Sequence, residues 1–247
     1  MIFPVYIRVG NLRLHPHVLF EILAFTAGFG VFLYLRRRER DHLSEDLRWW
    51  VVTAGIVGAA IGCRLLACFD TPHAAVPGKT VVGGIIGGIF AVEVAKRRLG
   101  VTTATGDLFA IPIALGIAIG RIGCFLTGLT DDTYGTVTTL ALGVDFGDGI
   151  KRHPVQLYEI AFLLVLIPML KTFWKRQRSQ GDTFKLFVIT YMVWRLIVDC
   201  LKPAGRIAGL SAIQIACLVM LVYYFRDFTR IASALQRQKS MAGAKNA

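Results

Sequence analysis

The stretch "GRIGCFLTGLTDDTYG", residues 120–135, closes one of the most apolar parts of the chain. It places Arg121 beside glycines, where a membrane helix would have hydrocarbon, and it runs directly into Asp131 and Asp132. An ionisable group inside a membrane is costly, so it normally faces a protein interior or water and marks a functional site. The stretch therefore predicts a membrane helix with a polar site at one end.

The composition agrees with a polytopic membrane protein. Of the 247 residues, 55% are hydrophobic, and the mean hydropathy of +0.57 is too high for a soluble domain. We expect an all-α bundle of about seven transmembrane helices forming one domain over residues 1–230, and a disordered cytoplasmic tail over 231–247. The expected helices cover about 16–35, 49–69, 80–95, 107–127, 156–170, 184–201 and 208–225.

The charge distribution predicts the orientation of the chain in the membrane. The net charge is +12, which in a soluble protein would suggest a nucleic-acid partner. Here 18 of the 28 Lys and Arg residues lie in alternate loops and the tail, and seven lie in the loops between them. The positive-inside rule then places the N-terminus in the periplasm and the C-terminus in the cytoplasm, with no nucleic acid involved. The longest outer loop, about 128–153, would form a small periplasmic cap.

Three arginines lie within or near the apolar segments, namely Arg64, Arg121 and Arg195. Planar guanidinium groups match phosphate oxygens bidentately, so together they predict an anion site. Simpler interpretations stay open, because Arg64 could reach the headgroup layer and Arg195 could be neutralised by Asp199 one turn later.

Other charges near the apolar segments have plain interpretations as well. His17 and Glu21 share one helical face, and His17 could be a neutral, hydrogen-bonded core residue. Asp107 could cap a helix N-terminus, and Glu93 could pair with Lys96 one turn later.

Glycines recur beside these charges. The run "VVGGIIGG", residues 81–88, spaces two glycine pairs four residues apart, led by Gly83 and Gly84. Such spacing is typical of close helix packing, and it would equally let the backbone approach a ligand headgroup. Gly120 and Gly123 give the helix with Arg121 a similarly thin face.

The stretch "RHPVQLYEI", residues 152–160, predicts a helix start. Pro154 suits the first turn, which puts His153 near the N-cap and opens the helix N-terminus toward anions. Gln156 and Glu159 lie one turn apart on one face, as pocket residues or as a plain solvated face.

The five cysteines lie within or at the ends of apolar segments and form no CxxC pair. They predict small buried apolar residues and no metal or redox site. The cysteines are Cys63, Cys68, Cys124, Cys200 and Cys217.

Taken together, "GRIGCF", "HPVQLYE" and "RLIVDCLK" resemble the prolipoprotein diacylglyceryl transferase family, whose patterns are GRIGNF, HPxQLYE and an arginine–acid pair in a late helix. The shorter stretches "IGCRL", "GGIIG", "GD" before the fourth segment and "SAIQI" at Gln214 fall in the expected order along nearly the whole chain.

The resemblance implies a bacterial inner-membrane enzyme whose active site faces the outer leaflet. Such an enzyme moves the diacylglyceryl group of phosphatidylglycerol onto a prolipoprotein cysteine, releases glycerol phosphate and needs no metal or cofactor. By this resemblance Arg121 holds the lipid phosphate, while Arg195, oriented by Asp199, stabilises the leaving phosphate or gates the site. With the residues discussed above, the substrate-binding set is Arg64, Gly83, Gly84, Gly120, Arg121, Gly123, Gln156, Tyr158, Glu159, Asp199 and Gln214.

The chain departs from the family pattern at several chemically important positions. Val82 replaces a histidine, Cys124 replaces the asparagine of the signature, His17 replaces a tyrosine, and "GLTDDTYG" is longer than its counterpart. A thiol must lose its proton to attack, so another base is needed. The catalytic candidates besides the arginines are His17, Asp131 and His153.

Three functions follow from this sequence. The first is a lipid-dependent transferase acting on a prolipoprotein or a related membrane acceptor. The second is a non-catalytic membrane protein that binds or moves anionic lipid, which the replaced residues favour. The third is a secondary transporter, which predicts an inverted repeat, and none is visible in the sequence.

Overall fold

The computed structural model describes residues 3–10, 12–38, 43–70, 78–176, 179–203 and 209–233. The chain divides into two compact units, each described by itself. The first comprises Met1–His42, Leu108–Thr172 and Ile197–Gly205, and the second comprises Leu43–Asp107, Phe173–Leu196 and Arg206–Ala247. Most of the expected tail, residues 234–247, lies outside the described residues.

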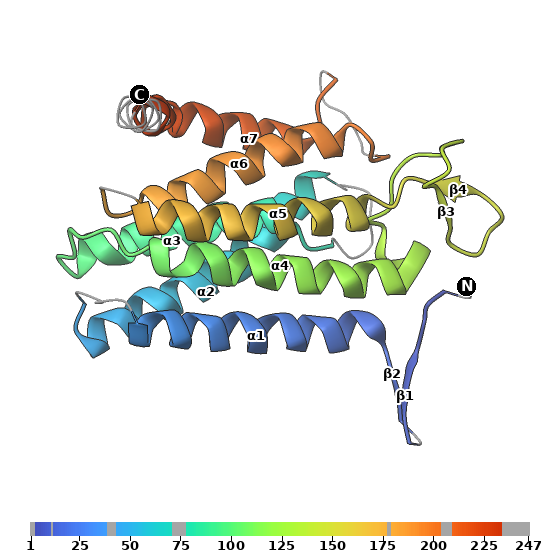
Figure 1. Cartoon of the computed structure of the whole chain (residues 1–247), viewed down its shortest axis with the longest axis horizontal. Helices are drawn as coiled ribbons and strands as arrows, with labels where there is room; N and C mark the ends of the chain where they lie inside the picture. The colour runs from blue at the N-terminus through green and yellow to red at the C-terminus, as the bar shows by residue number, and fades with distance from the viewer. Residues whose placement is uncertain are drawn as a thin grey trace, which may run out of the picture. The chain divides into compact units, whose positions relative to one another are not determined.

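All long elements are α-helices, as expected, and the strands are short (Figure 1). The helices are α1 (Pro16–Arg38), α2 (Glu45–Asp70), α3 (Val81–Arg98), α4 (Asp107–Thr127), η1 (Gly128–Asp131), α5 (Val155–Arg176), α6 (Asp182–Asp199) and α7 (Ala212–Tyr223). The strands are β1 (Ile7–Val9), β2 (Leu12–Leu14), β3 (Val144–Asp145) and β4 (Lys151–Arg152), paired antiparallel as β1–β2 and β3–β4.

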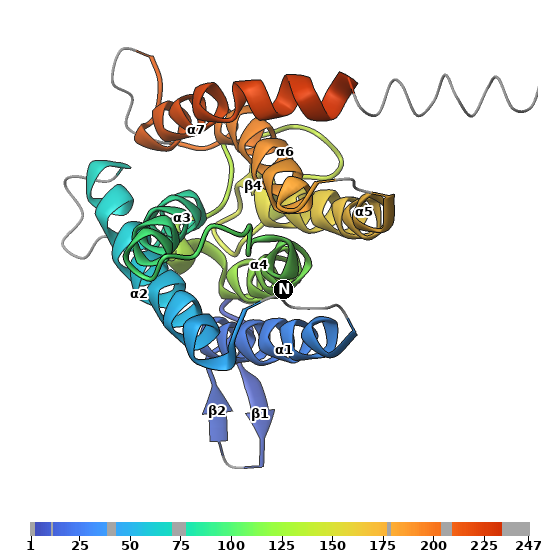
Figure 2. The ribbon, with the colours of Figure 1, turned by 90° about the vertical axis from the view of Figure 1, so that its left-hand side faces the viewer.

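In the first unit, α1 and α4 lie side by side (Figures 1 and 2). Glycines allow this close approach: a Cβ on Gly28 would lie 3.2 Å from the carbonyl oxygen of Pro112, and one on Gly123 would lie 2.7 Å from Phe20 Cβ. Small residues at a helix contact let the backbones approach and gain van der Waals contact. The thin face of α4 beside Arg121 is therefore partly a packing surface for α1.

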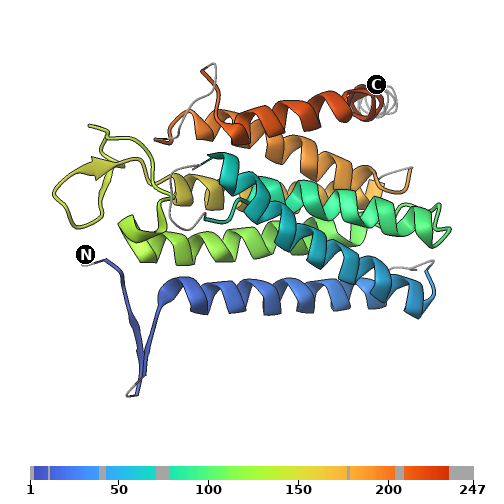
Figure 3. The same cartoon turned by 180° about the vertical axis from the view of Figure 1, so that it is seen from behind.

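The loop between α4 and α5 folds into a small cap. It turns through η1, forms the β3–β4 hairpin and returns to α5 at the same end of the unit as β1 and β2 (Figures 1 and 3). Phe146 is 2% exposed and its ring contacts those of Phe3, Phe125 and Tyr134. This aromatic cluster fixes the expected outer loop as an ordered structure.

In the second unit, α2 and α3 cross at glycines (Figure 2). A Cβ on Gly62 would overlap the carbonyl oxygen of Gly83, and a Cβ on Gly58 would overlap that of Gly87. The glycine run of α3 therefore serves close helix packing, the first of its two interpretations. Gly84 differs, because a Cβ there would make only an ordinary contact, 3.6 Å from Cys63 Cβ.

Asp107 bonds to a helix far along the sequence. Its carboxylate accepts hydrogen bonds from the N–H groups of Gly181 at 2.6 Å and Phe184 at 3.1 Å. Gly181 directly precedes α6 and Phe184 lies in its first turn, where a helix leaves N–H donors without intrahelical partners. A carboxylate at this position also complements the positive end of the helix dipole. The expected capping residue thus caps the start of α6, where Gly181 lies 74 residues beyond it.

The number of membrane spans differs from the seven that the sequence predicts. Within the described ranges, four helical segments are long and apolar enough to cross a membrane: α1, α2, Asp107–Asp131 and α5. A fifth arises if Ala212–Tyr223 and Phe225–Ser233, which meet at a bend of 57°, form one broken span. The chain is thus an all-α membrane protein with four or five candidate spans.

The prediction of seven spans was wrong because α3 and α6 are short and charged. Each has 18 residues, and each carries four charged side chains, which leaves no uninterrupted apolar window. These residues are Glu93, Lys96, Arg97 and Arg98 in α3 and Asp182, Lys185, Arg195 and Asp199 in α6. Some are paired, as expected for Glu93 and Lys96, whose carboxylate and ammonium groups lie 3.0 Å apart.

The glycine crossing gives a test of the α2–α3 contact. We expect Gly62→Ala to lower the thermal unfolding midpoint of the purified protein in detergent, because a forced overlap typically costs about 1–3 kcal/mol. Gly84→Ala, in the same contact, is the matched control and should leave the midpoint unchanged. Equal midpoints for the two variants would contradict the crossing.

Candidate active site

A buried ion pair joins α4 to α5 in the first unit. Arg121 Nε lies 2.9 Å from Glu159 Oε2, and the two residues are 8% and 0% exposed. The Nε–H is not aligned on the oxygen, so the contact is an ion pair rather than a straight hydrogen bond. A buried charge is tolerated only when it is compensated, and Glu159 therefore holds the signature arginine in place and charged.

The start of α5 forms one wall of this region. The helix begins at Val155, directly after Pro154, which confirms the helix start predicted there. His153 Nδ1 lies 3.2 Å from the hydroxyl of Tyr158. The backbone of His153 also bonds in both directions across the cap, donating to Thr136 and accepting from Gly135. His153 is thus fixed by the cap and by the first turns of α5.

A chain of polar contacts runs from α1 across the cap to α5. His17 Nδ1 lies 2.8 Å from Asp131 Oδ1. The hydroxyl of Thr133 donates to Asp131 Oδ2 at 2.6 Å, and Gln156 Nε2 donates to that hydroxyl oxygen at 3.1 Å. Gln156 is 1% exposed, and within the described residues its Oε1 accepts no hydrogen bond. The predicted residues His17, Asp131 and Gln156 therefore belong to one network.

Cys124 joins this network from α4. Its sulfur, a ring nitrogen of His17 and a carboxylate oxygen of Asp131 lie within 4.8 Å of one another. Cys124 is buried, and it follows Arg121 by three residues on the same helix. The sequence predicted a small buried apolar residue at Cys124 and marked it as a replacement of the signature asparagine, but it gave neither Cys124 nor Thr133 a role in the site. The signal available for Cys124 was its position one turn after the signature arginine.

Each of the two helices α4 and α5 carries two site residues that lie one turn apart. On α4 Arg121 precedes Cys124 by three residues, and on α5 Gln156 precedes Glu159 by three residues. Arg121 and Glu159 lie farther from the cap along their helices, and Cys124 and Gln156 lie one turn closer to it. A cationic group and a set of proton-accepting or metal-binding groups therefore lie one helical turn apart.

The hairpin of the cap carries its own ion pair at the surface. Arg152 Nη2 lies 2.7 Å from Asp148 Oδ2, and its guanidinium lies over the ring of Tyr134 at 5.2 Å. The hydrogen bond from Arg152 lowers the pKa of the Asp148 carboxyl below its ordinary value. Because Asp148 is exposed, solvent screens this pair and its effect on stability is small.

The remaining predicted site residues lie on other helices. Arg64 is exposed on α2, and Gly83 is packed in the α2–α3 crossing. Gln214 forms a capping box with Ser211 at the start of α7, and its Nε2 donates to the carbonyl of Leu196 at 3.4 Å. Their roles toward a substrate stay predictions.

Arg195 and Asp199 follow one another by one turn near the end of α6, and both are 2% exposed. Gly120 and Gly123 flank Arg121, and only Gly123 meets a neighbouring helix, because among the described residues nothing lies within 4 Å of a Cβ built on Gly120.

The expectation that all cysteines are buried was wrong: Cys68 and Cys200 are exposed and Cys63 is intermediate. A membrane helix can leave such a small apolar side chain exposed, because lipid does not penalise it.

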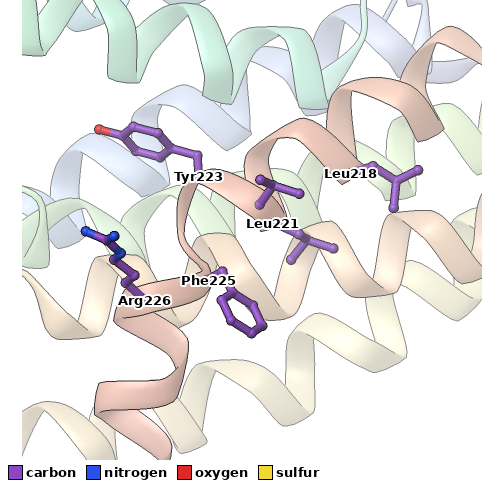
Figure 4. Close-up of a pocket in the computed structure, with 6 residues that line it drawn as sticks. Leu218, Leu221, Tyr223, Phe225 and Arg226 are labelled. Carbon is purple, nitrogen blue, oxygen red and sulfur yellow. The ribbon is translucent and has the colours of Figure 1, made fainter.

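An apolar hollow of about 690 Å³ lies at the bend after α7 (Figure 4). Its lining is Leu218, Leu221, Val222, Tyr223, Phe225 and Arg226. Its only charged residue is Arg226, and it contains neither a group that could activate a thiol nor any of the predicted site residues. The network around Arg121 and His17 is the better candidate.

Comparison with known proteins identifies the family of this chain. The sequence profile described as prolipoprotein diacylglyceryl transferase matches residues 4–226. The chain belongs to this family. It is therefore a multi-pass membrane transferase, as the signature residues indicated.

Several relatives are named phosphatidylglycerol–prolipoprotein diacylglyceryl transferase. The protein from Clostridium tetani is 29% identical over 238 residues, covering 89% of this chain and 94% of its own length. Those from Bordetella parapertussis and Geobacter sulfurreducens are each 30% identical, covering 85% of this chain and 86% and 85% of their own lengths.

The buried ion pair gives a test of the site's architecture. We expect Glu159→Gln to lower the free energy of unfolding by about 3–5 kcal/mol, because it removes a buried counter-charge from Arg121. The double variant Arg121→Gln/Glu159→Gln should be less destabilised than the sum of the two single variants. Chemical denaturation of all four proteins in detergent measures this coupling, and strict additivity would contradict it.

Proposed function

We propose that this chain transfers the diacylglyceryl group of phosphatidylglycerol to the cysteine thiol of a prolipoprotein at the outer face of the bacterial inner membrane. A related membrane acceptor with a thiol would fit the same chemistry. The observation that carries this proposal is the buried Arg121–Glu159 pair one turn away from the partly exposed His17–Asp131 pair, in a chain of this family.

The reaction needs an anchor for the lipid phosphate, and Arg121 suits this role. A guanidinium is a planar fork with five N–H donors that matches phosphate oxygens, and the contact of its Nε with Glu159 fixes the group. Burial excludes water and strengthens this charge–charge interaction. As the glyceryl carbon–oxygen bond breaks, the leaving glycerol phosphate gains charge that Arg121 stabilises. The family resemblance also gives Arg195 and Asp199 a role toward the leaving phosphate.

The reaction also needs a means of removing the proton from the acceptor thiol. Val82, at the position of the family histidine, is apolar and 1% exposed, so it cannot serve. The His17–Asp131 pair fills this role in the proposal: the carboxylate orients the imidazole, as in other nucleophile-activating pairs. The thiolate sulfur then bonds to the glyceryl carbon, and the carbon–oxygen bond electrons leave with glycerol phosphate. His153 is paired with Tyr158 and would shape the headgroup pocket with Gln156.

The basic residues support an orientation for this site. Arg36–Arg38 end α1, and Lys175 and Arg176 end α5, which by the positive-inside rule puts these ends in the cytoplasm. The site lies at the opposite ends of both helices, on the outer side. This orientation places the N-terminus in the periplasm. If the bent pair after α6 is a fifth span, the C-terminus then lies in the cytoplasm.

The orientation can be tested by labelling. Thr139→Cys, exposed in the cap, should react with a membrane-impermeant maleimide in spheroplasts, because the cap would face the periplasm. Arg176→Cys should react only after the membrane is opened, in a background with the exposed cysteines replaced. Protection of the cap position in intact spheroplasts would reverse the orientation.

The activity can be tested with purified protein, phosphatidylglycerol and a synthetic lipobox peptide, followed by mass. We expect the peptide to gain one diacylglyceryl group. Arg121→Ala should slow turnover by about 10²–10³-fold through loss of charge stabilisation, and His17→Ala by about 10²–10⁴-fold through loss of thiol activation.

Asp132→Asn is the matched control. Asp132 is the exposed neighbour of Asp131 and has a left-handed backbone, which asparagine also adopts, so turnover should stay at the original rate. A folded protein that binds phosphatidylglycerol and never modifies the peptide would favour the non-catalytic lipid-binding function. Turnover unaffected in Arg121→Ala would contradict the phosphate role.

A further inference from the structure

Three side chains that depart from the family pattern or lie in the extended segment meet at one point. They are His17 from α1, Cys124 from α4 and Asp131 from the cap, and one ligand atom of each lies within 4.8 Å of the other two. We propose that His17, Cys124 and Asp131 bind a Zn²⁺ ion that activates the acceptor thiol. The proposal rests on the proposed function and makes His17 and Asp131 metal ligands in place of a base pair.

The donor atoms fit zinc better than other common ions. A nitrogen, a thiolate sulfur and a carboxylate oxygen are the three ligand types that Zn²⁺ takes, whereas Mg²⁺ and Ca²⁺ take oxygen ligands. With zinc bonds of about 2.0–2.3 Å, neighbouring ligand atoms of a tetrahedral site lie about 3.3–3.6 Å apart. The His17–Asp131 distance of 2.8 Å is shorter than this, and the 4.8 Å limit of the cluster is longer, so small side-chain shifts would suffice.

The surrounding contacts orient the ligands as metal sites require. Thr133 donates to Asp131 Oδ2, which leaves Oδ1 as the oxygen that faces His17. The other ring nitrogen of His17, Nε2, lies 3.8 Å from a carboxylate oxygen of Glu21. A metal-bound histidine usually directs its second nitrogen toward a carboxylate, which fixes its tautomer and ring orientation. Gln156 extends this support through its hydrogen bond to Thr133.

Three protein ligands leave a fourth position for the substrate. Structural zinc sites are closed by four protein ligands, whereas catalytic sites keep one open. The side chain of His17 is 35% exposed, so the cluster is accessible, while Cys124 is buried behind it. The open position suits the thiol of the acceptor cysteine.

The chemistry balances without a dedicated base. A thiol that binds Zn²⁺ gives up its proton to solvent, because coordination stabilises the thiolate. The bound sulfur forms the carbon–sulfur bond to the glyceryl carbon, the carbon–oxygen bond breaks, and glycerol phosphate leaves with its electron pair. Arg121 precedes Cys124 by one turn on α4 and, in this proposal, stabilises the leaving phosphate. Metal activation would thus replace the histidine that is absent at Val82.

The test uses full-length protein purified in detergent, with Zn²⁺ and then Co²⁺ as probes. We expect about one zinc ion per chain by elemental analysis and, after cobalt substitution, a sulfur-to-cobalt charge-transfer band. Cys124→Ser should abolish the band, while His17→Ala and Asp131→Asn should weaken metal binding by at least about 10-fold. The matched controls Cys68→Ser and Asp132→Asn should keep both the band and the affinity.

The outcomes separate this proposal from the proposed function. Protein without stoichiometric zinc or cobalt binding, or a cobalt band that survives Cys124→Ser, would overturn the metal site. Peptide modification that persists in metal-stripped protein would overturn it too, while leaving the transferase function intact with His17 as the base. A bound metal with the expected variant pattern and no peptide modification would keep the metal site and reject the proposed function.

Discussion

The ion pair between Arg121 and Glu159 constrains the rest of the site. A guanidinium in an apolar interior must be compensated, and Glu159 can do so only if α4 and α5 meet at that level. Once they do, the next turns of the two helices also face each other. Cys124 and Gln156 are then brought to one height, and the cap between the helices must supply whatever fills the space between them. Asp131 and Thr133 do this.

Close helix packing explains some of the glycines near the predicted site and does not explain others. Gly83 and Gly123 lie where a Cβ would collide with a neighbouring helix, so their place in the family-like motifs has a structural cause. Gly120 differs, because nothing lies within 4 Å of a Cβ built on it. Packing therefore gives no reason for a glycine directly before Arg121. In the proposed function, a glycine there would let a lipid headgroup approach the backbone.

Local sequence patterns predicted where individual helices begin and end. The expected segment 107–127 coincides with α4, and the helix start at Pro154 was placed correctly. Hydropathy alone could not settle the spans, since α3 and α6 combine apolar residues with four charges each. Contacts between distant residues, such as Asp107 with Gly181 or His17 with Asp131, leave no periodic signal. Gln214 is different, because the local pattern Ser-x-x-Gln at 211–214 is itself typical of the capping box that the structure shows, whereas its pocket role was inferred only from the family resemblance.

Two of the residues that depart from the family pattern are far apart in the sequence and close together in the structure. Read one by one, Val82, Cys124 and His17 are losses of a base, an amide and a phenol. In the structure, Cys124 and His17 meet at Asp131, which the extended segment supplies, and Val82 is simply apolar and buried. Random loss would scatter replacements, and it would not be expected to assemble a nitrogen, a sulfur and an oxygen donor around one point. This arrangement supports the proposal that one means of thiol activation has been exchanged for another.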